Sequence, residues 1–230
     1  MSRAIEVELK FEISDPVEVA NYVQKLEVLG KKRIVDEYLD TRDAALFVQG
    51  VFIRIRNGQK FDIKFNADDI LKTREQKIEH THCDEVSNEL PLTDLAMDQI
   101  NSAAKILQMA PMVHPDLTDF VSRNDLVPSL VIDKRRTSYQ AGEFHIDIDT
   151  VEGLGSFLEI EKMTDELGDR EALLSRMHEQ LRGLEIKHVD VGYNELYWRK
   201  HNFDLYLKGK YLLAEDRKTY RPESLGAVAG

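Results

Sequence analysis

Several residue types and patterns are rare or missing in this chain of 230 residues. Its one cysteine, Cys83, cannot form a disulfide within the chain, which is typical of a reducing compartment. The longest apolar runs fall far short of the ~20 residues that cross a bilayer, and the first residues lack the apolar core of a signal peptide. We therefore expect a cytoplasmic protein with no membrane partner.

The glycine-rich loop of Walker-type nucleotide sites, G-x-x-x-x-G-K-[ST], is also missing. Basic residues number 31 against 42 acidic ones, and the formal net charge of -11 is spread along the chain. Such a chain has no general attraction to nucleic acid phosphates, so we predict no nucleic-acid partner. With 42% hydrophobic residues, the chain is long enough for one sizeable globular domain or two small ones.

What is present begins with an alternation of apolar and charged residues near the N-terminus. The stretch IEVELKFEI predicts a half-buried β-strand over residues 5–13. One face would enter the core, and the other would carry Glu6, Glu8 and Lys10. Neighbours on such a face lie about 7 Å apart. Solvated strands often carry these residue types, so this stretch alone does not identify a site.

Strand and helix signals then alternate along the chain. Extended structure is predicted within residues 34–65 and 130–163, and Asn57-Gly58 between two alternating runs is typical of a hairpin turn. Capping residues and helical spacing of apolar residues predict helices over residues 15–30, 93–109, 169–183 and 193–207.

Charges of like sign recur on the polar faces of the predicted strands. Three strands carry a pair of carboxylates each, namely Glu6/Glu8, Asp147/Asp149 and Glu159/Glu161. The basic sets are Lys10, Arg54/Arg56, Lys64, Lys134/Arg136 and, if residues 66–91 include a strand, Arg74.

The alternation leaves two interpretations of these faces open. The faces could be exposed to solvent and form surface ion pairs that stabilise the fold by ~0–1 kcal/mol each. They could instead line an enclosed space, where crowded like charges are costly unless a ligand neutralises them. Clustered carboxylates suit Mg²⁺ or Mn²⁺, and clustered Arg and Lys suit phosphate oxygens. A metal-bound polyphosphate would satisfy both sets.

Six motifs in order resemble those of the CYTH superfamily, the triphosphate tunnel metalloenzymes. EVELK at residues 6–10 is similar to the E-x-E-x-K signature of that family, and YLDTRDAALFVQGVFIRIR, DIKF, TRE, IDKRRTSY and GEFHIDIDTVEGLGSFLEIE follow. The resemblance covers roughly residues 4–200, and its second half is most similar to class IV adenylate cyclases. It implies an α+β fold in which a closed, eight-stranded antiparallel β-barrel forms a tunnel with helices packed outside.

The resemblance also implies roles for individual residues. The carboxylates that would hold Mg²⁺ or Mn²⁺ are Glu6, Glu8, Asp147, Asp149, Glu159 and Glu161. The side chains that would hold the triphosphate are Lys10, Arg54, Arg56, Lys64, Arg74, Lys134 and Arg136. Glu8, Glu159 and Lys10 would be catalytic. Residues 1–200 would form the tunnel domain and residues 201–230 a C-terminal extension.

The expected activity is that of a class IV adenylate cyclase, which converts ATP to cyclic AMP and pyrophosphate with a divalent metal. One alternative is a hydrolase on the same scaffold that acts on tripolyphosphate, thiamine triphosphate or a nucleoside triphosphate, because a doubled E-x-E motif is also common among triphosphatases of the superfamily. Another is a module that binds a polyphosphate without turnover. A homodimer through outer strand edges or helices is compatible with the pattern, which does not fix it.

Overall fold

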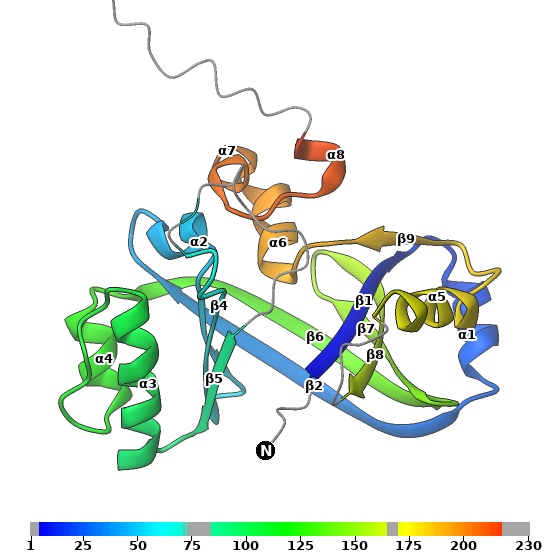
Figure 1. The fold of residues 1–230 in the computed structure, drawn as a ribbon. Coiled ribbons are helices and arrows are strands. Elements are labelled where there is room, and N and C mark those ends of the chain that lie inside the picture. Colours follow the sequence, from blue (N-terminus) through cyan, green and yellow to red (C-terminus); the bar gives the residue numbers. More distant parts are fainter. Residues whose placement is uncertain (1–4, 71, 73–83, 165–169, 218–230) are drawn as a thin grey trace, which may run out of the picture. The chain divides into compact units, whose positions relative to one another are not determined.

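A computed structural model describes residues 5–70, 72, 84–164 and 170–217. Its strands form a sheet with the order β5-β4-β3-β2-β6-β7-β8-β1-β9 (Figure 1). The strands are β1 (Ile5–Ile13), β2 (Glu27–Asp40), β3 (Phe52–Arg56), β4 (Lys60–Phe65), β5 (Asp84–Glu89), β6 (Val127–Ala141), β7 (Phe144–Val151), β8 (Gly155–Thr164) and β9 (Ile186–Val189). The helices are α1 (Pro16–Val23), α2 (Ala45–Gln49), α3 (Asp94–Ile106), α4 (Leu117–Arg123), α5 (Arg170–Gln180), α6 (Tyr193–His201), α7 (Phe203–Lys208) and α8 (Ala214–Arg217).

The predicted α+β fold on a large antiparallel sheet is confirmed, whereas the closed eight-stranded barrel is not. The sheet has nine strands, and its order has two ends, β5 and β9. No pairing among the described strands joins these ends. The helix predicted over residues 15–30 is too long, because α1 ends at Val23 and Gly30 lies within β2.

The chain divides into two compact units, each described by itself. Unit 1 comprises residues 1–34 and 133–192, and unit 2 comprises residues 35–132 and 193–230. Strands β2 and β6 contribute residues to both units. The boundary predicted near residue 200 stays a prediction. Within the described part of the chain, every helix is too short or too polar to cross a membrane.

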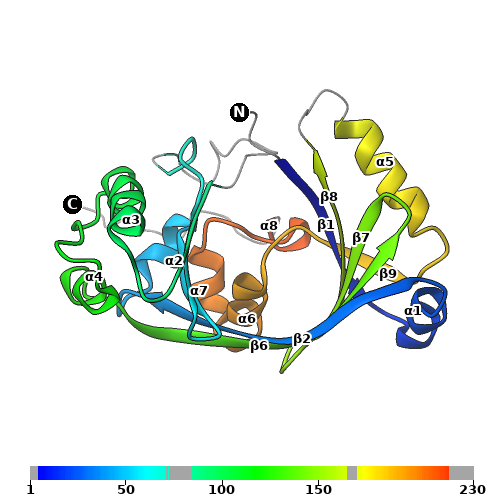
Figure 2. The same cartoon turned by 90° about the horizontal axis from the view of Figure 1, so that it is seen from below.

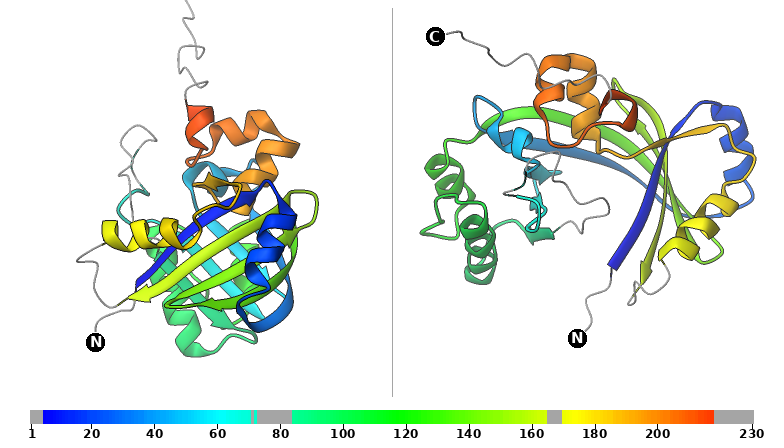
Figure 3. Two further views of the ribbon diagram at one scale, coloured as in Figure 1. Left: turned by 90° about the vertical axis from the view of Figure 1, so that its right-hand side faces the viewer. Right: turned by 45° about the horizontal axis from the view of Figure 1, so that its top comes forward.

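In unit 1, helices α1 and α5 cover one face of strands β1, β7 and β8 (Figures 2 and 3). Helix α1 begins where the sequence predicts, because Asp15 accepts hydrogen bonds from the backbone of its first turn. Fully buried Ile146, Leu158 and Ile160 pack with Met177 of α5 in one apolar cluster. Alternate residues of the same strands therefore lie on the opposite face of the sheet.

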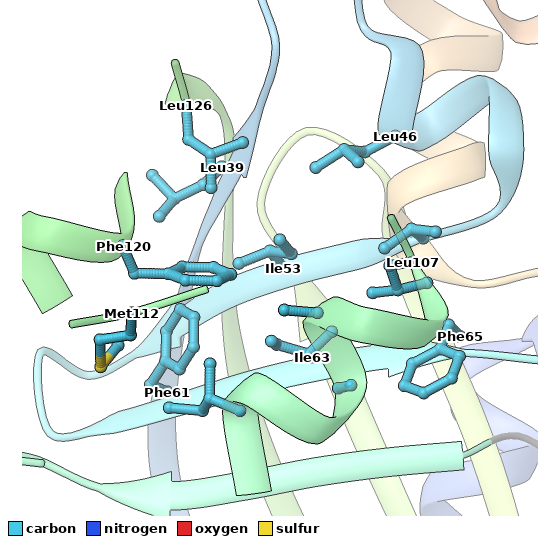
Figure 4. Close-up of a cluster of buried hydrophobic side chains, with 14 of the residues drawn as sticks. Leu39, Leu46, Ile53, Phe61, Ile63, Phe65, Leu107, Met112, Phe120 and Leu126 are labelled. Carbon is cyan, nitrogen blue, oxygen red and sulfur yellow. The ribbon is translucent and has the colours of Figure 1, made fainter. Parts of the chain in front are cut away.

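In unit 2, a second apolar cluster lies between helices α3 and α4 and one face of strands β3 and β4 (Figure 4). Ile53, Phe61 and Ile63 are fully buried in it, and the rings of Phe61 and Phe120 meet edge to face with centroids 5.8 Å apart. Because strand residues alternate, Arg54 lies on the face of β3 that points away from this cluster.

Candidate functional site

The strand register of unit 1 gathers predicted site residues from three strands on the sheet face opposite α1 and α5. Lys10 of β1 is paired with Glu159 of β8, and Glu159 is paired with Asp147 of β7. Two residues from Lys10 in β1, Glu8 is paired with Glu161 of β8. Carboxylates that are far apart in the sequence are thus neighbours across strands.

Lys10 links the N-terminal motif to the acids of β8. Its Nζ lies 3.2 Å from Glu159 Oε1 and 3.8 Å from Glu8 Oε1. The two glutamates therefore lie on the same side of the sheet and share one ammonium group. An arrangement of this kind can present both carboxylate oxygens and a positive charge to the same ligand.

Arg136 of β6 is the centre of the densest ion-pair network in this face. Its guanidinium donates hydrogen bonds to both oxygens of Asp149, at 2.7 and 2.6 Å, and also to Asp147 and Glu159. Lys134 Nζ lies 2.6 Å from Asp149 Oδ2. The predicted basic and acidic residues are therefore paired with one another.

The network is buried, which distinguishes it from ion pairs on a solvent-exposed strand face. Asp149 is fully buried, and the side chain of Glu159 is 7% exposed. Burial alone would raise the pKa of Glu159, but the charges of Lys10, Lys134 and Arg136 outweigh it and lower that pKa to about 2. Arg136 and Lys134 likewise hold the pKa of Asp149 below its usual value. Scattered surface ion pairs do not describe this face.

Two polar residues of this face were missed by the sequence analysis. His145 lies between two predicted metal ligands, with Nε2 3.3 Å from Asp147 Oδ1 and Nδ1 3.1 Å from Glu161 Oε1. Ser138 Oγ donates a 2.5 Å hydrogen bond to Asp147. The parity of their positions could have placed both on the polar face, but only the register between strands shows which carboxylates they contact.

The donor set of this face fits a hard divalent cation, because its acidic side chains offer only oxygen ligands. Glu8 and Glu161, opposite one another in register, are the more exposed carboxylates, at 36% and 23%. The backbone of Glu6 lies in β1, but its side chain is not among those described. Among the described residues, no three acidic, histidine or cysteine side chains lie together at metal-binding distances.

In unit 2, the predicted Arg54 and Arg56 share the face of β3 opposite the apolar cluster. Arg54 Nε donates to Asp62 Oδ2 at 2.8 Å, and Arg56 binds Asp36 with two hydrogen bonds of 2.7 and 2.9 Å. Asp36 and Asp62 were missed, although they occupy the matching alternate positions of IVDEYLD and FDIKF. The cationic strands of unit 2 thus carry buried acids that orient the arginines.

Lys64 lies on the same face and is more accessible than Arg54 and Arg56. Its Nζ lies 3.1 Å from Glu85 of β5, and its side chain is 34% exposed. On the same strand as Glu85, Ser87 Oγ donates a 2.5 Å hydrogen bond to the fully buried carboxylate of Asp62. Arg74, also predicted to bind phosphate, lies outside the described residues.

The comparison with protein families gives a single assignment for this arrangement. A family model for the CYTH domain matches residues 4–193. The chain belongs to the CYTH family. The match spans nearly all of the charged strands described above and agrees with the motifs of the sequence. It also supports the prediction that the chain is an enzyme of cyclase or triphosphatase type.

Two curated relatives carry adenylate cyclase names. A protein of Methanocaldococcus jannaschii, provisionally named adenylate cyclase MJ0240, is 28% identical over 196 residues, which is 81% of this chain and 93% of the relative. Adenylate cyclase CyaB of Aeromonas hydrophila is 46% identical over 55 residues, 24% of this chain and 27% of the relative.

Solved structures share the fold at low sequence identity. A Pyrococcus horikoshii protein has a TM-score of 0.56 at 23% identity, covering 85% of this chain and 99% of its own. The Hippeastrum protein HpAC1, described with a dominant triphosphatase activity, has a TM-score of 0.52 at 18% identity, covering 90% and 98%. At these identities the likeness concerns the fold alone.

Proposed function

We propose that this CYTH enzyme acts on a metal-bound triphosphate, and that its activity is that of a class IV adenylate cyclase. The observation that carries the proposal is the register of unit 1, which sets Glu8, Glu161, Lys10 and Glu159 side by side on one sheet face. Oxygen ligands for a divalent cation therefore adjoin an ammonium group that can bind a phosphate. The metal would be Mg²⁺ or Mn²⁺, and the protein would form a closed tunnel around its substrate as the family resemblance implies.

The proposed metal ligands are the carboxylates of the unit 1 face. Glu8 and Glu161 would bind the ion directly, with Glu159 beside them, and Glu6, Asp147 and Asp149 would complete or support the set. When bound, the ion would neutralise charge on the triphosphate and stabilise the charge that develops during reaction.

The proposed phosphate ligands are the basic residues of both units, because the family match extends over both. They are Lys10, Lys134 and Arg136 in unit 1, and Arg54, Arg56, Lys64 and Arg74 in unit 2. Four of the five N–H groups of Arg136 donate hydrogen bonds to carboxylates, which leaves one N–H of Nη1 for a phosphate oxygen. Its main role would be to hold the acids in place.

In the cyclase reaction, the ribose 3′-oxygen forms a bond to the α-phosphorus. The bond from that phosphorus to the bridging oxygen breaks, pyrophosphate leaves with the electron pair, and the hydroxyl proton is lost to solvent. Lys10 would stabilise the negative charge on the leaving group, since it is held beside the carboxylate face by two ion pairs.

Two findings support the cyclase and one supports a hydrolase. The segment KRRTSYQAGEFHIDIDTVEGLGSFLEIE resembles class IV cyclases, and both curated relatives are named as cyclases. The direct opposition of Glu8 and Glu161 favours the triphosphatase alternative, since two E-x-E motifs then meet across strands. In that reaction, water would attack the terminal phosphorus of tripolyphosphate, thiamine triphosphate or a nucleoside triphosphate.

Incubation with ATP and Mn²⁺, followed by separation of the products, tests the proposal. Cyclic AMP with pyrophosphate supports the cyclase, whereas phosphate release without a cyclic product contradicts it and supports the hydrolase. Glu8→Gln should lower kcat/KM by about 10²-fold or more. Glu12→Gln, an exposed change of the same kind in the same strand, is the matched control. Tight triphosphate binding without any turnover would indicate a binding module instead.

A further inference from the structure

The C-terminal segment, residues 193–217, begins where the CYTH family match ends and contains helices α6, α7 and α8. It belongs to unit 2. It contacts the rest of unit 2 at the start of β3 and just beyond β4.

The segment is held together by a buried polar hub. Tyr206 is fully buried, and its hydroxyl accepts a 2.8 Å hydrogen bond from the backbone of Leu213 and donates a 3.0 Å bond to Asp216. Arg199 of α6 donates to Asp216 at 2.7 Å and to Glu215 at 2.7 Å. These bonds join α6, α7 and α8, so the segment can act as one rigid piece.

One contact of the segment lies at the start of β3. The Tyr211 ring packs on Phe52 with centroids 6.2 Å apart, and it approaches Gly50 so closely that an added Cβ would lie 2.6 Å from the ring. Because Phe52 and Arg54 are two residues apart in β3, they share one face. Tyr211 therefore packs on the face of β3 that carries Arg54.

A second contact lies just beyond β4. Lys210 is buried, and its Nζ donates a hydrogen bond to the backbone carbonyl of Asp69. Lys64 lies near the end of β4 and is paired in register with Phe52. The two contacts thus hold the same end of the β3–β4 hairpin, where Lys64 is located.

We propose that the C-terminal segment is a positioning element that holds the end of the β3–β4 hairpin, and with it Lys64, in the arrangement that binds a triphosphate. Lys210 would fix the end of β4 through Asp69, and Tyr211 would fix the start of β3 through Phe52. The inference rests on the proposed function, since it requires that the cationic face of unit 2 binds phosphates. It adds a part of the chain that the family match does not include.

Calorimetric titration of the full chain with inorganic tripolyphosphate and Mg²⁺ tests this role. Lys210→Met and Tyr211→Leu should each weaken binding about threefold to tenfold. Lys208→Met, an exposed change of the same kind in the segment, should leave the affinity unchanged.

A double-mutant cycle with Lys64→Met separates positioning from packing. If the segment acts through Lys64, Lys210→Met should have a much smaller effect on tripolyphosphate affinity in the Lys64→Met background. Urea unfolding of each variant shows whether it folds, and Tyr211→Leu serves if Lys210→Met does not. Folded variants that bind tripolyphosphate as tightly as the unsubstituted chain would overturn this inference and leave the proposed function standing. An unsubstituted chain that does not bind tripolyphosphate would overturn the proposed function and this inference with it.

Discussion

At the scale of single residues, Arg136 illustrates how the face of unit 1 is held together. It is the shared partner of three buried carboxylates from β7 and β8. Removing one partner of a buried ion-pair network leaves uncompensated charges, which costs about 3–5 kcal/mol. We expect Arg136→Met to lower the free energy of unfolding in urea by this amount. Arg182→Met, which removes an exposed arginine paired with Glu179, should change it by less than about 0.5 kcal/mol. A small effect at Arg136 would contradict the network.

The low pKa of Glu159 gives a prediction about acid stability. Its pKa in the folded protein is about 2, below the ordinary value of 4.5. The folded state therefore binds the proton less tightly than the unfolded state, so the carboxylate stabilises the fold above pH 4.5 and loses this contribution as the pH falls toward 2. Unfolding free energies measured across this range should fall more steeply for the unsubstituted chain than for Glu159→Gln.

Exposed Glu171 of α5 provides the control for this pH dependence. Glu171→Gln should leave the fall in stability between pH 4.5 and 2 nearly unchanged. Equal slopes for the unsubstituted chain and Glu159→Gln would show that Lys10, Lys134 and Arg136 do not stabilise the ionised carboxylate.

Alternation in the sequence was sufficient to predict which residues share a strand face. Glu8, Glu159 and Lys10 could be grouped because each lies two residues from another charged side chain, and the family motif linked them. Their pairing depends on register across strands, and so do the contacts of His145 with Asp147 and Glu161 and of Asp62 with Arg54. Register is fixed by side chains far apart in the chain, so one strand's pattern does not contain it.

At the scale of secondary-structure elements, the hairpin that carries Arg54 and Lys64 depends on its turn. Asn57 and Gly58 both have positive φ, at 53° and 65°, as the Asn-Gly motif predicts. Gly58→Ala should destabilise the fold by about 1 kcal/mol in urea unfolding, because an alanine is strained in this conformation.

Gly30 in β2 provides a control that separates backbone strain from crowding. An added Cβ meets nothing within 4 Å at either glycine, and only Gly58 has positive φ. We expect Gly30→Ala to be neutral or slightly stabilising. Equal losses at the two positions would indicate that the turn conformation is not the cause.

Helices were predicted well where a cap coincided with helical spacing, and poorly where strand signals followed. Thr93 accepts a hydrogen bond from the backbone of Ala96, and α3 covers most of the range predicted for it. Helix α1 instead ends at Val23, since the residues after it continue into the long strand β2. The short strand β9 was not predicted, because its four residues are too few to show a period.

At the scale of the whole molecule, the sheet was predictable and its closure was not. Alternation along each segment predicts strands, and family motifs predict how many to expect. Closure requires strand number, tilt and stagger to agree, and these depend on pairing between the end strands. Within the described residues the order runs from β5 to β9 without such a pair. The tunnel therefore stays part of the proposal.

Hydrogen exchange tests whether one triphosphate engages the charged strands of both units. A ligand that binds only the folded state slows exchange in the elements it holds. With Mg²⁺ and tripolyphosphate, we expect slower amide exchange in β1, β7 and β8 of unit 1 and also in β3 and β4 of unit 2. Orthophosphate with Mg²⁺ is the control, because a single phosphate cannot extend across two sets of ligands. Protection confined to unit 1 would show that Arg54, Arg56 and Lys64 are fixed by their own acids and do not bind the substrate.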